Sequence, residues 1–304
     1  MRVGLDIGGT KTDAVGISAS GSVECELRLP TGFGHAAVVD TAVDAITRLA
    51  LLAGTTVSRF ESIGIGIPGA VDATGRVSHA VNLGLEGLDL GGQLSARLGR
   101  AVRIDNDVNA AALGAFHLLD LGDRESMAFL NLGTGLAAGL VMGGRLWRGA
   151  RGAAGEIGHI PVDPQGPVCP CGQRGCLEML ASGSAIARAW PTDDPTPARA
   201  LFAAAAAGDS AAIEVRDRFV ENVAAAVRIL VLTVDVDSVV IGGGLSSLGQ
   251  PLLDAVCGVL ARWEKESAFL ASTGIASRVA LLPSDFPAAA VGAALVGVAE
   301  THLV

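Results

Sequence analysis

Apolar and polar positions along the first half of the chain follow strand and helix periods in turn. The helical spacing of apolar residues from Asp40 to Leu52 predicts one helix. Short apolar segments bounded by glycine, proline and polar residues predict strands on either side of it. Strands and helices therefore alternate, which favours an α/β fold. The predicted strands cover Val3–Ile7, Asp13–Ser18, Val23–Leu29 and Ser62–Ile67, with a tight turn at Gly8–Lys11.

The second half of the chain continues this alternation. An alanine-rich helix is predicted from Ala198 to Ala207, and Asp209 with Ser210 offers an N-cap for a long helix that reaches Thr233. A β-branched strand, Asp237–Ile241, then ends in three glycines, a junction at which backbone can approach a ligand closely. The last predicted helix, about Ala288 to Glu300, is rich in small residues that permit close packing on a neighbouring element.

One strand–turn–strand plan occurs twice, about 125 residues apart. Gly4–Thr10 and Ala128–Gly135 each contain an apolar strand with one Asp or Asn, followed by a glycine-rich turn and a second apolar strand. A single hairpin of this kind is usually only a turn. Two copies predict two similar α/β lobes whose hairpin turns face one another across a cleft. Their backbone N–H groups would present donors to the phosphates of a nucleotide.

Composition narrows the classes of function. The chain has 304 residues, enough for two domains, and half of them are hydrophobic, which predicts a folded protein. The mean hydropathy is positive, but the densest apolar stretch, Val223–Val234, is short and contains Arg228, which argues against a membrane span. The N-terminus reaches Asp6 before any apolar leader, so we expect a cytoplasmic protein. The net charge of −9, with 22 scattered Lys and Arg residues, favours small-molecule substrates over nucleic acid.

The strongest chemical signal is a cluster of three cysteines with a preceding histidine. Cysteines in a reducing compartment favour metal binding over disulfides. Four ligands with short, glycine-punctuated spacing suit a tetrahedral zinc ion, and a site with every position filled by protein is structural. A redox pair fits this spacing less well. The predicted ligands are His159, Cys169, Cys171 and Cys176, whereas Cys25 and Cys257 are predicted to be buried thiols.

A second signal lies where the segment from Arg103 to Ala111 passes from a predicted strand into a helix. Polar side chains at the carboxyl end of a strand occupy the place where open α/β sheets bind ligands. Asp107 could simply cap a helix that begins near Ala110. Beside two phosphate-type turns, however, a carboxylate is what phosphoryl transfer to an alcohol needs, because it can take the hydroxyl proton.

Two glutamates flank the predicted zinc ligands. Glu156 precedes His159 by three residues, and Glu178 follows Cys176 by two. Isolated glutamates are usually solvated surface charges, but a metal-bound loop would fix these two, so that they could contact neighbouring sugar hydroxyls. One imidazole nitrogen of His159 could bind zinc and leave the other to meet a hydroxyl.

In these residues and motifs the chain resembles the ROK family, which groups bacterial glucokinases and other sugar kinases with sugar-responsive repressors. The resemblance covers nearly the whole chain, and the motifs are long and occur in the family's order. They are Asp6–Lys11, Pro68-Gly69, Asn82-Leu83, Asp105–Asn109, Leu132–Gly135, Gly155–His159, the cluster Cys169–Cys176 with Glu178, and Gly242–Gly244.

The resemblance implies an actin- or hexokinase-type fold of two ribonuclease-H-like lobes with an interlobe cleft. Residues 1–108 plus 287–304 would form the small N-terminal lobe, because the C-terminal helix returns to it. Residues 109–286 would form the large lobe, with the zinc-binding segment at 156–178. The resemblance also implies a homodimer, ATP with Mg²⁺ as the phosphoryl donor, and a structural Zn²⁺.

The resemblance assigns roles to individual residues. Asp107 would be the catalytic base, and Asp6 would sit near the magnesium ion. Sugar contacts would come from Gly69, Asn82, Asn106, Asp107, Glu156, His159 and Glu178. Cofactor contacts would come from Asp6, Gly8, Gly9, Thr10, Lys11, Gly133, Thr134, Gly135, Gly243 and Gly244. The zinc ligands would be the four named above.

The expected activity is therefore ATP-dependent phosphorylation of a hexose hydroxyl, with glucose as the leading substrate. N-acetylmannosamine, N-acetylglucosamine, mannose and fructose are alternatives, and polyphosphate could replace ATP. A sugar-responsive repressor would need a DNA-binding segment ahead of Asp6, and a sugar-binding protein without catalysis would need a lost base or broken turns. The segment Asn82–Gly87 lacks the tryptophan common in relatives, so the identity of the sugar is open, and Ala137 with Ala138 replaces glycines.

Overall fold

The chain forms two compact units. The computed structural model describes residues 1–122, 124–283 and 285–298. The first unit comprises Met1–Arg124, Val141–Ala154 and Pro287–Val304, and the second comprises Glu125–Leu140 and Gly155–Phe286. The first unit contains 109–124 and 141–154, which the predicted domain limits assign to the large lobe. Those limits, and the cleft predicted between the lobes, stay predictions.

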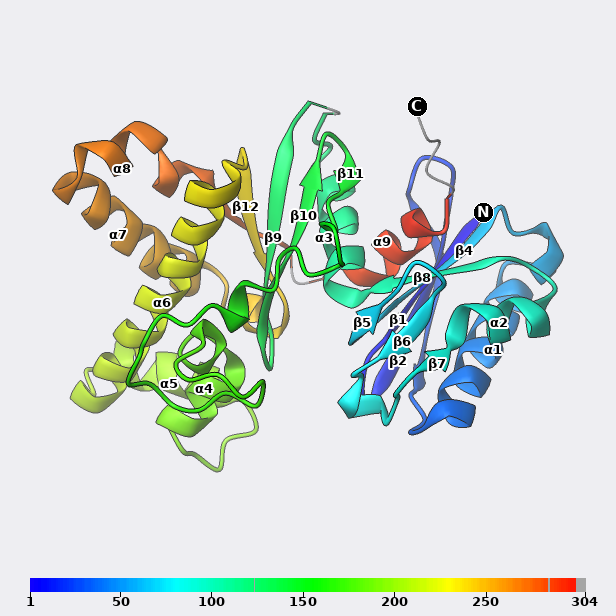
Figure 1. The fold of residues 1–304 in the computed structure, drawn as a ribbon, viewed down its shortest axis with the longest axis horizontal. Coiled ribbons are helices and arrows are strands. Elements are labelled where there is room, and N and C mark those ends of the chain that lie inside the picture. Colours follow the sequence, from blue (N-terminus) through cyan, green and yellow to red (C-terminus); the bar gives the residue numbers. More distant parts are fainter. Residues whose placement is uncertain (123, 284, 299–304) are drawn as a thin grey trace. The chain divides into compact units, whose positions relative to one another are not determined.

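The first unit is built on a five-stranded sheet of order β3-β2-β1-β4-β8 (Figure 1). β1 pairs antiparallel with β2 and parallel with β4, and β2 pairs antiparallel with β3, whereas β4 pairs parallel with β8. A three-stranded sheet of short strands, β5-β6-β7, follows β4. The bounds are β1 Arg2–Ile7, β2 Lys11–Ile17, β3 Val23–Pro30, β4 Ser62–Ile67, β5 Ala70–Val71, β6 Arg76–Ser78, β7 Leu88–Asp89 and β8 Val102–Asn106.

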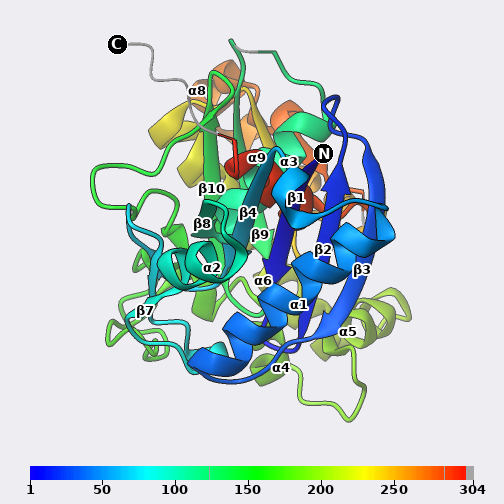
Figure 2. The ribbon, with the colours of Figure 1, turned by 90° about the vertical axis from the view of Figure 1, so that its right-hand side faces the viewer.

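Helices cover both faces of this sheet. α1 (His35–Leu52) lies over the face shown toward the viewer in Figure 2, where Ala42, Ile46 and Leu49 join the core with Leu5 of β1. α3 (Asp107–Leu118) and α9 (Ala288–Val296) cover the other face. α2 (Leu90–Leu98) precedes β8 and packs against it.

The small residues of α9 have the packing role that the sequence predicts. A Cβ atom on Gly4 would lie 2.0 Å from the Ala290 carbonyl oxygen, and one on Gly292 would lie 1.7 Å from the Ala110 carbonyl oxygen. Side chains at these glycines would therefore push α9 away from β1 and α3. This close approach positions the start of α3 next to the carboxyl end of β1. The predicted end of this helix at Glu300 lies outside the described residues.

The second sheet repeats the order of the first, as β11-β10-β9-β12-β13. β12 pairs parallel with both β9 and β13. The end of β10, with β11, groups with the first unit. The bounds are β9 Ser126–Leu132, β10 Leu136–Met142, β11 Arg145–Leu146, β12 Ser238–Gly242 and β13 Val279–Leu281. The helices of the second unit are α4 Gly183–Ala189, α5 Pro197–Ala206, α6 Ser210–Val234, α7 Gln250–Glu266 and α8 Ala268–Thr273.

The long helix α6 follows its predicted signals closely. The Asp209 side chain accepts a hydrogen bond from the Ala212 backbone N–H, so it is the N-cap that the sequence indicates. The helix ends at Val234, and the following Asp235 adopts the left-handed conformation (φ 55°). Val223, Val227 and Leu230 form its buried stripe. α6 and α7 pack against the β12–β13 side of the second sheet.

Candidate active site and metal site

The first glycine turn connects β1 to β2. The Gly8 N–H donates to the Lys11 carbonyl oxygen at 2.9 Å, which closes the hairpin. A Cβ on Gly9 would lie 3.3 Å from the Cβ of Asn82, so the loop containing Asn82 packs directly on the turn. The Thr31 N–H donates to the Thr10 carbonyl at 3.1 Å. Four predicted ligand-binding residues, Gly8, Gly9, Thr10 and Asn82, are therefore together in the first unit.

Three carboxylates lie close together beside this turn. Asp6 of β1 pairs in register with Asp13 of β2. Burial, together with the negative charges of Asp107 and Asp13, raises the pKa of Asp6 from 3.8 to about 7, against a lowering by Lys11. A Cβ on Gly66, which pairs in register with Asp6, would lie 3.4 Å from the Cα of Asp107, so the predicted base lies near the predicted magnesium residue.

Asp13 has cationic partners of its own. The Arg28 guanidinium on β3 donates from Nε and Nη2 to the two carboxylate oxygens, the second bond measuring 3.2 Å. The Lys11 ammonium lies 3.6 Å from the same carboxylate. These pairs compensate the negative charge of Asp13.

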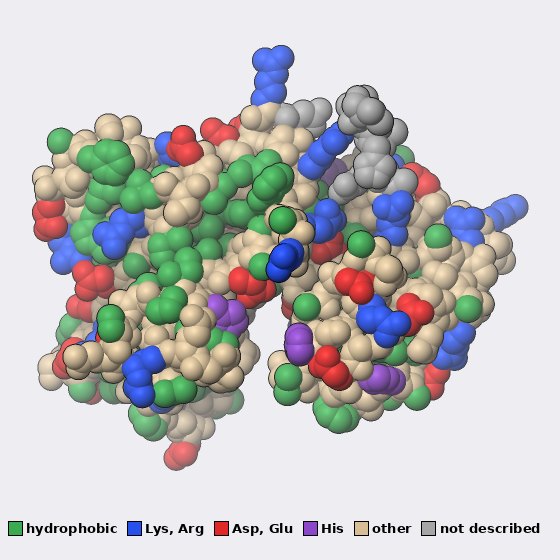
Figure 3. Space-filling view, in the orientation of Figure 1, with side chains coloured by type: hydrophobic (Ala, Val, Ile, Leu, Met, Phe, Trp, Pro, Cys, Tyr) green, Lys and Arg blue, Asp and Glu red, His purple; other side chains and the backbone are tan. Residues whose placement is uncertain are grey.

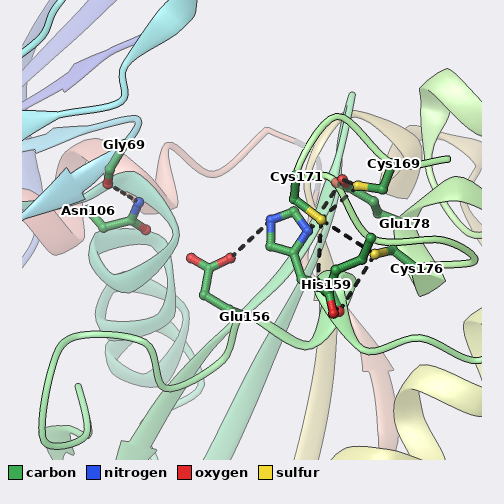
Figure 4. A network of polar contacts seen from close by, with 9 residues as sticks. Gly69, Asn106, Glu156, His159, Cys169, Cys171, Cys176 and Glu178 are labelled. Atoms are coloured by element: carbon green, nitrogen blue, oxygen red, sulfur yellow. Dashed lines mark hydrogen bonds and ion pairs between the residues drawn. The ribbon is translucent and has the colours of Figure 1, made fainter.

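The loop from β8 into α3 carries Asp107. Asn106, not Asp107, is the N-cap, because its Oδ1 accepts from the N–H groups of Val108 and Asn109. Asp107 is the first residue of α3, and the expected helix start near Ala110 was three residues too late. The Asn106 side-chain amide donates to the Gly69 carbonyl at 3.0 Å (Figure 4). The helix cap therefore fixes two predicted sugar contacts together.

The conformation at Gly69 admits only glycine. Its φ is 100°, and a Cβ there would lie 2.5 Å from the Ser78 carbonyl oxygen. This turn directs the Gly69 carbonyl to Asn106. Glycine is therefore needed at this position so that the backbone carbonyl can reach Asn106. The dipeptide Pro68-Gly69 alone did not reveal this role.

Asp105 and Arg148 were missed as functional candidates. The Asp105 side chain is buried, and the Arg148 guanidinium donates to its Oδ2 from Nε at 2.9 Å and from Nη2 at 2.7 Å. The available signal was an aspartate on a predicted strand, where a buried charge needs a partner. Its partner lies 43 positions away, in a glycine-rich stretch with several arginines, so spacing could not have identified it.

The second glycine turn, in the second unit, connects β9 to β10. The Gly133 N–H donates to the Gly135 carbonyl at 3.1 Å, and the Gly133 carbonyl accepts from Gly183 at the start of α4 at 2.8 Å. A Cβ on Gly243 would lie 2.5 Å from the Asn131 Oδ1, and the φ of Gly243 is 80°. The turn and Gly243, which were predicted as separate cofactor contacts, are therefore adjacent.

The four predicted zinc ligands lie together in the second unit. One ligand atom from each of His159, Cys169, Cys171 and Cys176 lies within 4.8 Å of the others. The Cys171 and Cys176 sulfurs are 3.6 Å apart, and the Cys169 sulfur is 3.9 Å from the His159 Nδ1. Two sulfurs bound at about 2.3 Å to one tetrahedral zinc lie about 3.8 Å apart. The cluster therefore fits a structural Cys3His zinc site.

Hydrogen bonding and burial shift the pKa values of the three thiols in different directions. Backbone N–H donation from Gln173 lowers the pKa of Cys171 from 9.0 to about 6. Burial raises the pKa of Cys169 to about 12 and also raises that of Cys176. Buried thiols of this kind ionise when a metal ion supplies the compensating charge.

The imidazole of His159 has a distinct environment at each nitrogen. Nδ1 points toward the cysteines, whereas Nε2 lies 3.8 Å from the Glu156 carboxylate (Figure 4). Of the alternatives that the sequence left open, this orientation favours Nδ1 as the metal ligand and Nε2 as the nitrogen available to a substrate.

Glu178 connects the cysteine cluster with the second glycine turn. Its Oε1 accepts from the Cys169 thiol at 3.1 Å and lies 3.6 Å from the His159 Nδ1. Its Oε2 lies 3.1 Å from the position that a Cβ on Gly135 would occupy. The second unit therefore joins Glu156, His159 and Glu178 to the hairpin at Gly133–Gly135.

A comparison with known proteins identifies the family. The model of the ROK family matches residues 2–281, which is most of the chain. The chain belongs to the ROK family. A glucokinase from Halalkalibacterium halodurans is 34% identical over 277 residues, which cover 84% of this chain and 83% of the relative. An N-acetylmannosamine kinase from Citrobacter koseri is 34% identical over 250 residues, which cover 79% of this chain and 82% of the relative.

A solved ROK structure extends the likeness to the fold. The ROK family glucokinase from Streptomyces griseus, in complex with glucose and AMPPNP, has a TM-score of 0.78 and 29% identity and covers 97% of this chain and 98% of that one. The predicted α/β, hexokinase-type fold is confirmed.

Of the described residues, no helix is both long and apolar enough to span a bilayer. On the face drawn in Figure 3, Lys and Arg side chains are scattered among Asp and Glu.

Proposed function

We propose that this ROK protein transfers a phosphoryl group from ATP to a hydroxyl of a hexose, with glucose as the first candidate substrate. The observation that carries the proposal is the proximity of Asp107 and Asp6, both next to Gly66 of β4, beside the first glycine turn. Relatives named glucokinase support the choice of sugar. The complex of a family glucokinase with glucose and AMPPNP, an ATP analogue, supports the choice of donor.

Asp107 acts as the general base in this proposal. Phosphoryl transfer has a loose transition state with little covalent work for the protein, so positioning and charge neutralisation supply most of the acceleration. The Asp107 carboxylate orients the sugar hydroxyl and takes its proton as the oxygen attacks the γ-phosphorus. Its place as the first residue of α3 sets the carboxylate at the positive end of the helix dipole.

The nucleotide is assigned to the two glycine turns. The N–H groups near Gly8–Lys11 and Gly133–Gly135 are the proposed donors to its phosphates, with Gly243 and Gly244 at the adjoining strand end. Asp6, whose pKa near 7 reflects burial and neighbouring negative charge, is the proposed residue beside Mg²⁺. When bound, the ion would neutralise phosphate charge. A cation there would also stabilise the ionised form of Asp6.

The sugar is assigned to residues of both units. Asn106, Asn82 and the backbone near Gly69 are the proposed contacts from the first unit. Glu156, Glu178 and the Nε2 of His159 are the proposed contacts from the second. Zinc bound at Nδ1 would hold the imidazole and, through the cysteine loop, the segment that leads to Glu178. Carboxylate pairs are suited to neighbouring hydroxyls, because each oxygen accepts a hydrogen bond.

The substrate alternatives remain within the same reaction class. N-acetylmannosamine has direct support from the Citrobacter koseri relative, and N-acetylglucosamine, mannose and fructose are the other candidates. Polyphosphate is the alternative donor.

A sugar-responsive regulator is the second candidate function, because the family also includes transcriptional regulators. A cytoplasmic homodimer is the proposed state, and sedimentation analysis of the purified chain tests its subunit number.

A coupled assay of ADP release tests the proposal. The purified chain, loaded with zinc and supplied with Mg²⁺ and ATP, is tested against glucose, mannose, fructose and the two N-acetylhexosamines. Polyphosphate is tested separately by formation of sugar phosphate. We expect sugar-dependent ADP release with the highest kcat/KM for glucose. Saturable sugar binding by calorimetry with no turnover on any donor would support the regulator instead and overturn the kinase proposal.

A further inference from the structure

Asp105 is a buried carboxylate with a full set of hydrogen-bond donors. It is 5% exposed, and its Oδ1 accepts from the Asn106 N–H at 2.8 Å and from the Asn109 side-chain amide at 2.9 Å. Its Oδ2 accepts two bonds from Arg148, at 2.9 and 2.7 Å. The carboxylate therefore connects four donor groups, and a buried charge without such partners would be strongly destabilising.

The Oδ1 of Asp105 accepts hydrogen bonds from residues on both sides of Asp107, the proposed base. Asn106 precedes Asp107 by one residue, and Asn109 follows it by two. Asn106 is also the N-cap and the partner of the Gly69 carbonyl. The position of Asp105 consequently determines the first turn of α3, in which Asp107 sits.

Arg148 reaches Asp105 from a separate segment of the first unit. It follows β11, and its carbonyl accepts from the Ala154 N–H at 3.2 Å, across a loop that begins with Gly149 at φ 73°. The backbone around Arg148 is thus itself held in place. Nε and Nη2 meet the same oxygen, an arrangement that a lysine ammonium can reproduce in charge but not in its two fixed donors.

We propose that Arg148 and Asp105 form a positioning pair that holds Asp107 in the geometry required for proton transfer. This inference rests on the proposed function, because the pair positions Asp107, the proposed base. Neither residue touches the substrate in this proposal. Their effect is on kcat, since a catalytic group displaced by about 1 Å can lower a rate by about 100-fold.

Four variants test the pair. Arg148→Gln removes the cation, Arg148→Lys keeps the charge, Asp105→Asn removes the buried carboxylate, and the double variant removes both charges. We expect Arg148→Gln to lower kcat by about 10- to 100-fold with little change in the KM for ATP. Arg148→Lys should recover part of this loss. The double variant should lose less than the product of the two single losses, because no unpaired charge remains.

Arg151→Gln is the matched control. Arg151 is an exposed arginine in the same loop, and its replacement should leave kcat unchanged. Thermal unfolding of each variant, together with active-site titration, gives the rate per folded molecule. A normal kcat per folded Arg148→Gln molecule, with only the stability reduced, would mean that the pair is structural and would overturn the proposal.

Hydrogen exchange separates failure of this inference from failure of the proposed function. In the Arg148→Gln protein, the amides of residues 106–110 should exchange at least about tenfold faster, whereas those of α1 should not change. If the wild-type chain phosphorylates no sugar, the proposed function fails, and the exchange measurement still decides whether Arg148 holds this loop. Unchanged exchange at residues 106–110 contradicts the positioning pair in either case.

Discussion

The two units share a strand order and a glycine-rich turn, but they differ in the charged residues around that turn. Each sheet runs 3-2-1-4-5 in its own strand order, and each carries a glycine-rich turn after its first strand. In the first unit, Asp6 aligns with Gly66 of the neighbouring parallel strand, and in the second, Asn131 aligns with Gly242. The framework is therefore repeated down to the glycine beside the polar residue.

The difference lies in charge. Seven residues after Asp6 the first unit has Asp13, whereas seven residues after Asn131 the second has Ala138. Asp107 adds a further carboxylate to the first unit, and burial with these neighbours raises the pKa of Asp6 to about 7. The hairpin of the second unit has no charged side chain, and two acidic residues of this unit, Glu156 and Glu178, lie beside His159 of the cysteine cluster. The same turn geometry is therefore surrounded by different charges in the two units, and under the proposed function only the first unit supplies the base.

The sharpest test of this division is removal of the proposed base. Asp107→Ala should lower kcat by about 10²–10⁴-fold, while sugar affinity weakens less, because general-base catalysis contributes an effect of that size. Steady-state kinetics with a calorimetric measurement of sugar binding would check both. Asp89→Asn is the control, since Asp89 is an acidic residue at the start of α2 in the same unit. Near-normal turnover of the Asp107→Ala protein would contradict the assignment of Asp107 as the general base.

The next largest effect concerns the segment of the second unit that contains the four proposed zinc ligands. Chelation, or Cys171→Ser, should disorder the segment from Glu156 to Glu178 and raise the KM for sugar by about 10- to 100-fold before it affects ATP. Metal content by mass spectrometry, run beside the kinetics, would tie the change to zinc. Cys257→Ser is the control, because this half-buried thiol lies outside the cluster. An unchanged sugar KM in metal-free protein would contradict the coupling.

The pH dependence of stability should distinguish Asp6 from a carboxylate of the second unit. The pKa of Asp6 is raised in the folded state, so the folded chain holds a proton that the unfolded chain releases above about pH 4. The unfolding free energy should therefore fall as pH rises from about 4 to 7. Asp6→Asn should remove this loss and stabilise the protein at pH 8 by about 1–3 kcal/mol, allowing for the partial exposure of the side chain.

Asp237 supplies the opposite case for the same experiment. The Ser126 hydroxyl and N–H donate to its carboxylate and lower its pKa. Its contribution is present at neutral pH and is lost as pH falls through the lowered pKa, so Asp237→Asn should destabilise at pH 7 and have little effect in acid. Chemical denaturation at several pH values checks both variants. Parallel pH profiles for Asp6→Asn and wild type would contradict the raised pKa.

Local signals predicted the elements and the metal ligands well. The Asp209 cap, the long helix after it and the hairpin strands follow from periodicity and capping chemistry, which act over a few residues. The Cys3His cluster was predictable for the same reason, since three ligands fall within eight positions. Motifs shared with the family added proposed roles for Asp107 and the glycine turns, which stay predictions.

Long-range partners were not predictable in this way. The bond between Arg148 and Asp105 joins segments 43 positions apart, and several arginines near Arg148 are equivalent in sequence. The raised pKa of Asp6 depends on its burial and on the charges of Asp107 and Asp13, which the start of α3 and the sheet register bring near it. The cap at Asn106 was misjudged because Asn and Asp are nearly equal as N-caps, so propensity could not separate adjacent residues.

The smallest predicted effect asks whether the neutrality of the second hairpin matters. Asn131→Asp would place a carboxylate beside the turn, since the Asn131 Oδ1 lies 2.5 Å from the Cβ position of Gly243. Repulsion of the nucleotide phosphates by about 1 kcal/mol should raise the KM for ATP by about fivefold, with kcat and the sugar KM nearly unchanged. Asn222→Asp, on α6, is the matched control. If the ATP affinity were insensitive to the charge at position 131 and sensitive only to the first hairpin, nucleotide binding would belong to one unit, and the repeated turn would be a relic of the fold.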